Sequence, residues 1–137
     1  MLIVPELLVS DLRQSLAFWC ELCGFEIVYD RPEDEFALLD RGGCRIMLEG
    51  AFAPGRRWIT GPLERPFGRG LNLEIGVTDI SPVVDALAAA AWPLYLAPEI
   101  KWYRAGEHEA GVRQFIVQDP DGYLLRFSQR LGGRGAV

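Results

Sequence analysis

The pattern of apolar and polar positions opens with a short strand and an amphipathic helix. Residues 4–9 predict the strand, and the following segment places apolar side chains at helical spacing. The apolar face of this helix consists of Leu12, Leu16, Trp19, Cys20 and Cys23. Ser10 or Asp11 can cap its start, and Gly24 can end it.

Strand-like segments follow at 25–30, 35–40 and 44–50, and residues 41–43 predict a hairpin between the last two. Residues 51–70 are rich in proline and glycine and lack periodicity, so they predict a linker. This linker is long for a plain connector, and long loops in compact domains are often functional.

The pattern then repeats. LLVSDL at 7–12 is echoed by IGVTDI at 75–80, and a second helix is predicted over 81–92. Further strands are predicted at 93–100, 111–118 and 123–129. Each half therefore has the order β-α-β-β-β. Because a half of about 60 residues makes a marginal core, we expect the halves to pack together or to be exchanged between subunits.

Composition and charge argue against two classes of protein, nucleic-acid binders and membrane-spanning proteins. The chain of 137 residues has a net charge of −5, which argues against general nucleic-acid binding. No apolar run approaches the ~20 residues of a membrane span, and the start does not resemble a signal peptide, so a cytoplasmic protein is expected. Four arginines in the linker predict a solvated loop rather than a phosphate site: Arg56, Arg57, Arg65 and Arg69.

The chain has few cysteine and histidine side chains that could ligate a metal ion such as zinc. Cys20 and Cys23 have the spacing of a redox or zinc pair but lie at the end of a helix, so burial is the favoured interpretation. His108 is the only histidine, and its Glu-His-Glu context predicts a solvent-facing loop. Residues 119–122 predict a hairpin turn, and Arg126 lies in the strand that follows.

The duplicated unit resembles the vicinal oxygen chelate superfamily, which includes glyoxalase I, extradiol dioxygenases and bleomycin-resistance proteins. The resemblance rests on V-S-D-L, the A-F-W of the first helix, the following G-F, and D-P-D-G-Y-L-L-R-F near the end. It implies an α+β fold in which two tandem βαβββ modules form a cup-shaped, partly closed mixed sheet. We expect one domain over 1–137: module 1 at 1–50, the linker at 51–70, module 2 at 71–130 and a frayed tail at 131–137.

The resemblance also locates the positions where metal-dependent relatives hold His and Glu ligands. Here those positions carry Val4, Met47, Asn72 and Arg126. Since these residues cannot make a His/Glu site, no metal and no cofactor are expected. A displaced ligand set remains as an alternative: Glu6, Glu49 and Glu74.

Absence of the ligands is characteristic of the bleomycin-resistance branch, whose members bind rather than catalyse. The resemblance therefore implies that a basic planar antibiotic binds in aromatic clefts at a dimer interface, with acidic groups meeting its positive charge. The expected ligand-binding residues are Phe36, Met47, Trp58, Phe67, Trp102, Tyr103 and Arg126. Arg126 is expected to pair with an acid such as Glu74 or to contact ligand. The resemblance also implies a homodimer with exchange of the first strand, which relatives hook at a proline, and Pro5 occupies such a position.

Two alternatives stay open at this point. One is a metal-dependent glyoxalase-like or lyase-like enzyme that uses the displaced ligand set. The other is a binding module for another aromatic metabolite, because a cup lined by aromatic side chains is generic.

Overall fold

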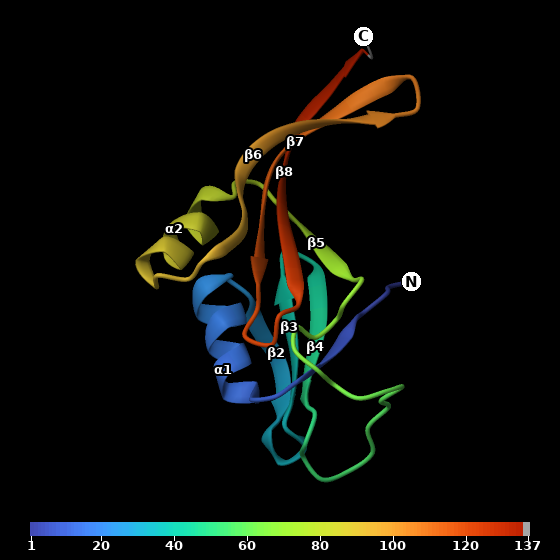
Figure 1. The fold of residues 1–137 in the computed structure, drawn as a ribbon, viewed down its shortest axis with the longest axis vertical. Helices are drawn as coiled ribbons and strands as arrows, with labels where there is room; N and C mark the ends of the chain where they lie inside the picture. Colours follow the sequence, from blue (N-terminus) through green and yellow to red (C-terminus); the bar gives the residue numbers. More distant parts are fainter. Residues whose placement is uncertain (136–137) are drawn as a thin grey trace. The chain divides into compact units, whose positions relative to one another are not determined.

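The structure, a computed structural model, describes residues 1–135 (Figure 1). The first half of the chain builds one four-stranded sheet, whose spatial order is β1-β4-β3-β2 with β1 parallel to β4. Its elements are β1 Glu6–Val9, α1 Leu12–Leu16, η1 Ala17–Leu22, β2 Glu26–Arg31, η2 Pro32–Asp34, β3 Phe36–Arg41 and β4 Cys44–Gly50.

The first helix forms where the apolar spacing predicts it. Asp11 is its N-cap and accepts a hydrogen bond from the Gln14 backbone N–H at 3.2 Å. The helix widens into a π-helical stretch at η1, and Gly24 follows with a φ of +78°. The most buried side chains of this helix are Ser15, Phe18, Trp19 and Cys23. The buried face is therefore shifted from the predicted one, since Leu12, Leu16 and Cys20 are only partly buried.

The second half repeats the architecture, which confirms the internal duplication. Its sheet has the order β5-β8-β7-β6, with β5 parallel to β8. Its elements are β5 Asn72–Val77, α2 Ser81–Ala89, β6 Leu94–Ala105, β7 His108–Gln118 and β8 Leu124–Gly135. Neither sheet closes on itself, because each ends in two unpaired edge strands in the described chain.

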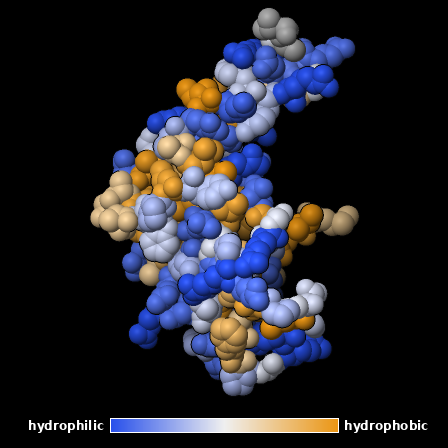
Figure 2. All heavy atoms as spheres, viewed as in Figure 1, coloured by the Kyte–Doolittle hydropathy of each residue, from blue (hydrophilic) through white to orange (hydrophobic). Residues whose placement is uncertain are grey.

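Two segments depart from the sequence prediction. Residues 101–111, expected as an insertion between strands, extend β6 and β7 into one long hairpin, so His108 lies in a strand although it is exposed. Residues 131–135, expected as a frayed tail, continue β8 and pair with β7. Residues 136 and 137 of that predicted tail lie outside the described part. The distal part of this three-stranded ribbon has a largely hydrophilic surface (Figure 2).

Contacts divide the chain into two compact units. The N-terminal unit comprises residues 1–69 together with 119–123, and the C-terminal unit comprises 70–118 and the chain from 124 onward. The turn 119–123 thus packs with the first module, although it follows β7 in the sequence. Whether both modules form a single domain remains a prediction.

Hydrogen bonds explain why this turn belongs to the N-terminal unit. Asp121 accepts from the backbone N–H of Ser10 at 2.9 Å and from its hydroxyl at 2.6 Å. Trp19 Nε1 donates to Asp119 at 3.3 Å, and the Tyr123 hydroxyl donates to the Leu8 carbonyl at 2.8 Å. Within the turn, Gly122 N–H donates to the Asp119 carbonyl, as expected for a β-turn.

Candidate functional site

The N-terminal unit contains a cavity of about 410 Å³ on the open face of its sheet. Three of the predicted ligand-binding residues line it together: Phe36, Met47 and Trp58. Phe36 and Met47 come from adjacent strands, and Trp58 comes from the linker. Phe36 is buried, whereas Trp58 is 72% exposed. Of these two aromatic rings, the one that solvent can reach therefore comes from the linker.

Arg57 fixes the linker to this cavity. Its guanidinium lies 2.7 Å from Glu49 Oε1 and donates hydrogen bonds to the carbonyl oxygens of Gly50 and Asp34, at 2.8 Å and 3.1 Å. The Arg57 side chain is only 9% exposed. The prediction that all four linker arginines form a solvated loop is therefore wrong for Arg57, because it neutralises a carboxylate that is itself largely buried.

A second carboxyl group lies beside Glu49. Partial burial, followed by a hydrogen bond to Glu49 and the charge of Glu49, raises the pKa of Glu6 above its ordinary value. Arg57 and Arg31 oppose this shift through their positive charges. Glu6 and Glu49, together with Arg31 and Arg57, therefore make the polar part of this cavity.

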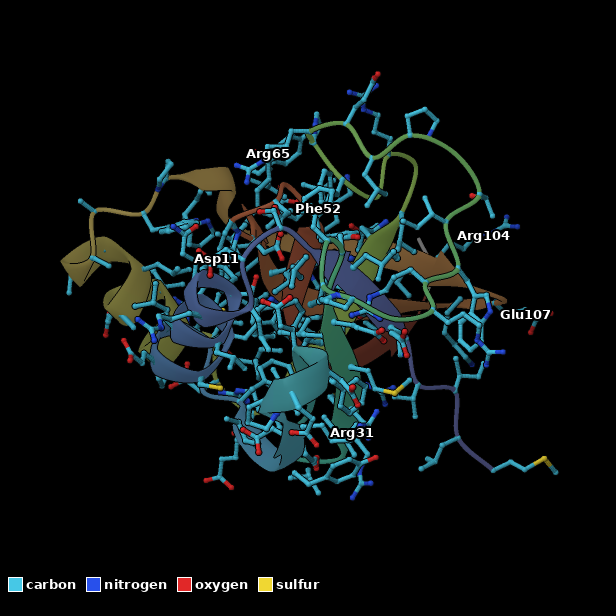
Figure 3. All side chains as sticks on the ribbon, turned by 90° about the horizontal axis from the view of Figure 1, so that it is seen from below. Asp11, Arg31, Phe52, Arg65, Arg104 and Glu107 are labelled. Atoms are coloured by element: carbon cyan, nitrogen blue, oxygen red, sulfur yellow. The ribbon has the colours of Figure 1, made fainter. Side chains whose placement is uncertain are left out.

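Two aromatic rings of the same cavity each lie against the planar guanidinium group of an arginine of the chain. The guanidinium carbon of Arg31, a residue labelled in Figure 3, lies 4.1 Å from the Phe36 ring centroid. That of Arg56 lies 4.8 Å from the Trp58 ring centroid. Both distances are typical of cation–π contacts, so these ring faces accept flat positive groups.

The C-terminal unit has a separate cavity of about 730 Å³ that contains two more of the predicted residues, Tyr103 and Arg126. Arg126 Nη2 lies 3.4 Å from Glu74 Oε2, and the two residues are register partners on β8 and β5. The predicted ion pair is thus confirmed. Glu6 and Met47 occupy the corresponding register positions of the N-terminal sheet.

The remaining predicted residues, Phe67 and Trp102, line neither of these two cavities, although Phe67 lines a third cavity of about 380 Å³ together with Trp58. Phe67 is buried edge-to-face against Tyr123, with ring centroids 6.0 Å apart. Trp102 lies against Gly111, and Arg134 stacks over its ring at 4.0 Å from the centroid. Both aromatic side chains therefore have packing partners within the chain, and their role in ligand binding remains a prediction.

The sequence did not reveal the roles of two polar residues: Arg57, which lines the N-terminal cavity, and Gln114, which lies behind Tyr103 of the C-terminal cavity. Arg57 was assigned to a solvated loop, and Gln114 was assigned to a strand without a role. Gln114 is 2% exposed and donates hydrogen bonds to Glu99 and Tyr103. A polar residue within the apolar run of 111–118 was the available signal, but its partners lie in another strand.

The donor set of the metal-dependent relatives does not fit here. Val4 precedes β1, Met47 offers a thioether, and Arg126 presents a positive charge already paired with Glu74. Hard or borderline divalent cations prefer carboxylate and imidazole ligands. Within residues 1–135, no three His, Cys, Asp or Glu side chains are grouped as metal ligands. Burial raises the pKa of the Cys23 thiol, which disfavours its thiolate form.

A sequence model of the Glyoxalase/Bleomycin resistance protein/Dioxygenase superfamily matches residues 3–127. The chain belongs to this superfamily. Among curated proteins of the superfamily, it is 30% identical to a bleomycin resistance protein of Geobacillus stearothermophilus, with 93% of this chain and 96% of the relative covered. It is 28% identical to a probable lactoylglutathione lyase of Synechocystis sp., with 88% of each chain covered.

Solved structures of the superfamily agree with the fold. TioX from Micromonospora sp. ML1 superimposes with a TM-score of 0.73 at 22% identity, covering 94% of this chain and 98% of that chain. A virulence protein from Salmonella typhimurium superimposes with a TM-score of 0.70 at 22% identity, and the match covers 94% of this chain and 95% of that chain. The predicted α+β fold of two βαβββ modules is confirmed. None of the helices within residues 1–135 is long and apolar enough to cross a membrane.

Proposed function

We propose that the protein is a metal-free small-molecule-binding protein of the bleomycin-resistance type, which sequesters a basic planar antibiotic. The observation that carries this proposal is the pair of cation–π contacts in the N-terminal cavity, at Phe36 and Trp58. A planar cationic group of a ligand can replace the exposed Arg56 guanidinium on Trp58. The neighbouring carboxyl group of Glu6 then meets the ligand's positive charge.

Three lines of evidence support this proposal over a catalytic role. The positions of the family's metal ligands carry side chains of unsuitable chemistry, and a relative of 30% identity is named a bleomycin resistance protein. The Glu49 carboxyl group of the N-terminal cavity is also paired with Arg57. A homodimer with exchange of the first strand belongs to the same proposal. Light scattering of the purified protein would measure its mass.

Calorimetric titration with bleomycin, with and without EDTA, tests the proposal. We expect saturable binding that EDTA does not change and that Trp58→Ala weakens by about fivefold to 150-fold, since stacking on one aromatic ring contributes about 1–3 kcal/mol. Tyr95→Ala is the matched control, because Tyr95 is an exposed aromatic residue of the C-terminal unit. Absence of binding by the natural chain, or equal weakening by both variants, would contradict the proposal.

A second candidate function is a metal-dependent lyase of the glyoxalase type. It is favoured by the relative named probable lactoylglutathione lyase and by the adjacent carboxyl groups of Glu6 and Glu49. Metal analysis separates the two functions. Stoichiometric zinc, nickel or iron in the purified protein, lost in Glu6→Gln and Glu49→Gln, would support the lyase and overturn the binding protein.

A further inference from the structure

The charged residues of the N-terminal cavity do not all pair with one another. Three arginines and three acidic residues line it: Arg31, Arg56, Arg57, Glu6, Asp34 and Glu49. Arg57 pairs with Glu49 at 2.7 Å, and a second ion pair of 3.0 Å joins Arg31 to Asp34. Within residues 1–135, Arg56 and Glu6 are therefore left without an ion-pair partner.

The Arg56 guanidinium lies on the ring of Trp58 instead, with its central carbon 4.8 Å from the ring centroid. Among the residues that the structure describes, this guanidinium donates no hydrogen bond. Both side chains are exposed. Because a cation–π contact at an exposed site is weak, the guanidinium can leave the ring at a small cost in free energy.

The main chain next to this contact is anchored. Arg57, the residue between Arg56 and Trp58, donates hydrogen bonds to the carbonyl oxygens of Gly50 and Asp34. It also donates to the carbonyl oxygen of Arg56, at 3.1 Å. The Arg56 side chain can therefore leave the ring by rotation about its own bonds, while the backbone that carries Trp58 stays in place.

The other aromatic ring of the cavity is less available. Arg31 covers Phe36, with its central carbon 4.1 Å from the ring centroid, and Asp34 holds Arg31 through an ion pair. Phe36 is also buried. A ligand would have to break an ion pair to reach Phe36, whereas at Trp58 it has to displace only a cation–π contact. The face of Trp58 is therefore the one that a ligand can take over.

We propose that the N-terminal cavity recognises a planar amidinium or guanidinium group of its ligand, and that Arg56 is an internal competitor for the same place on Trp58. A ligand group of this chemistry restores the contact that the Arg56 guanidinium gives up. The N–H donors at its edge match the two oxygens of a carboxylate, which Glu6 supplies in the same cavity. Because Arg56 occupies the ring in part of the molecules, it weakens the apparent affinity of every ligand for this face. The inference rests on the proposed function, since it names the ligand group that this site admits.

Three probe molecules test the natural chain: benzamidine, benzamide and benzylamine. Benzamide has the shape of benzamidine without its charge, and benzylamine has the charge without the planar head. Their affinities are measured from the NMR shift of the Trp58 indole N–H signal. We expect saturable binding of benzamidine and at least about fivefold weaker binding of both other probes, because only benzamidine combines a flat cation with paired N–H donors. Equal affinities for the three probes, or no saturable benzamidine binding, would overturn the proposal.

Two variants assign the effects to their residues. Arg56→Ala should raise the affinity for benzamide about threefold to sixfold, the effect of removing a competing cation–π contact at an exposed site. The affinity for benzamidine should rise at least as much, since a positive charge also leaves the cavity. Glu6→Gln should weaken benzamidine at least about fivefold and leave benzamide unchanged. Arg13→Ala is the matched control, because Arg13 is an exposed arginine of α1 that does not line this cavity. Unchanged or weaker benzamide binding in Arg56→Ala would refute the competition.

A bleomycin titration of the natural chain separates this inference from the proposed function. If bleomycin binds but benzamidine binds no better than benzamide, the inference fails and the proposed function stands. If benzamidine is preferred as described but bleomycin does not bind, the proposed antibiotic fails and the recognition of planar cations stands. The three-probe comparison uses the natural chain, so it decides the ligand class even if a variant does not fold.

Discussion

Trp19 in the first helix donates its indole N–H to the carboxylate of Asp119, at 3.3 Å, across a separation of 100 residues in the sequence. The Asp119 oxygens also accept from the backbone N–H groups of Asp121 and Tyr123. The D-P-D-G-Y motif is thus a docking element of the N-terminal unit. It explains why a turn of the second module contributes to the core of the first.

Asp119 should make stability depend on pH. Burial raises its pKa to about 6, although three hydrogen bonds oppose the shift. Because the pKa of Asp119 is higher in the folded chain than in the unfolded chain, the protonated carboxyl group stabilises the fold. This stabilisation is fully present below about pH 4 and is lost as the pH rises through 6. We expect the difference in unfolding free energy between the natural chain and Asp119→Asn to fall by up to about 3 kcal/mol from pH 4 to 7. Urea denaturation at several pH values measures it, and an increase over this range would contradict the assignment.

Asp121 should contribute to stability through three donors. Its carboxylate is 1% exposed and accepts from Ser10 twice and from Arg65 at 3.1 Å. Asp121→Asn replaces one acceptor oxygen with a donor and should lower the unfolding free energy by about 2–3 kcal/mol. Asp85→Asn on the exposed face of α2 is the control and should change it by less than about 0.5 kcal/mol. Similar effects in both variants would show that the network is not stabilising.

Arg57 should couple the linker to the N-terminal sheet. Arg57→Met leaves the Glu49 carboxylate largely buried without its partner and should cost about 3 kcal/mol of unfolding free energy. Adding Glu49→Gln should recover part of this loss, since the unpaired charge is then removed. Arg56→Met, at an exposed position, should change stability by only about 0.5 kcal/mol. A double variant that is no more stable than Arg57→Met would argue against the ion pair.

Gly111 should be required for the packing of Trp102. A Cβ atom at Gly111 would lie 2.7 Å from the Trp102 ring, so Gly111→Ala must displace the indole. We expect a loss of about 1–3 kcal/mol, with faster amide exchange in the β6–β7–β8 ribbon and a shift in tryptophan emission. Gly133→Ala is the control in the same ribbon, because its Cβ would meet only a backbone oxygen at an ordinary 3.5 Å. Unchanged ribbon exchange in Gly111→Ala would refute this packing.

Most strands, helices and turns were predictable because the residues that determine them lie close together in the sequence. The two-residue turn after Arg41 has positive φ at Gly42 and Gly43, and these glycines predicted the hairpin. The prediction failed at 101–111, where charged side chains suggested a loop. There, pairing with β8 extends a largely hydrophilic ribbon, since backbone hydrogen bonds and the stacking of Trp102 hold it without an apolar face.

The sequence by itself determined the duplicated modules, most of their strands and helices, and the conformation of the turn at 119–122. These features depend on periodicity, on turn residues and on residue identity, which are properties of the chain alone. Only the tertiary structure decided that Arg57 is buried on Glu49, that Asp119 receives the Trp19 indole, and that Gln114 keeps an unpaired oxygen. Burial and hydrogen-bond satisfaction depend on partners from other strands, so they exist only once the chain has folded.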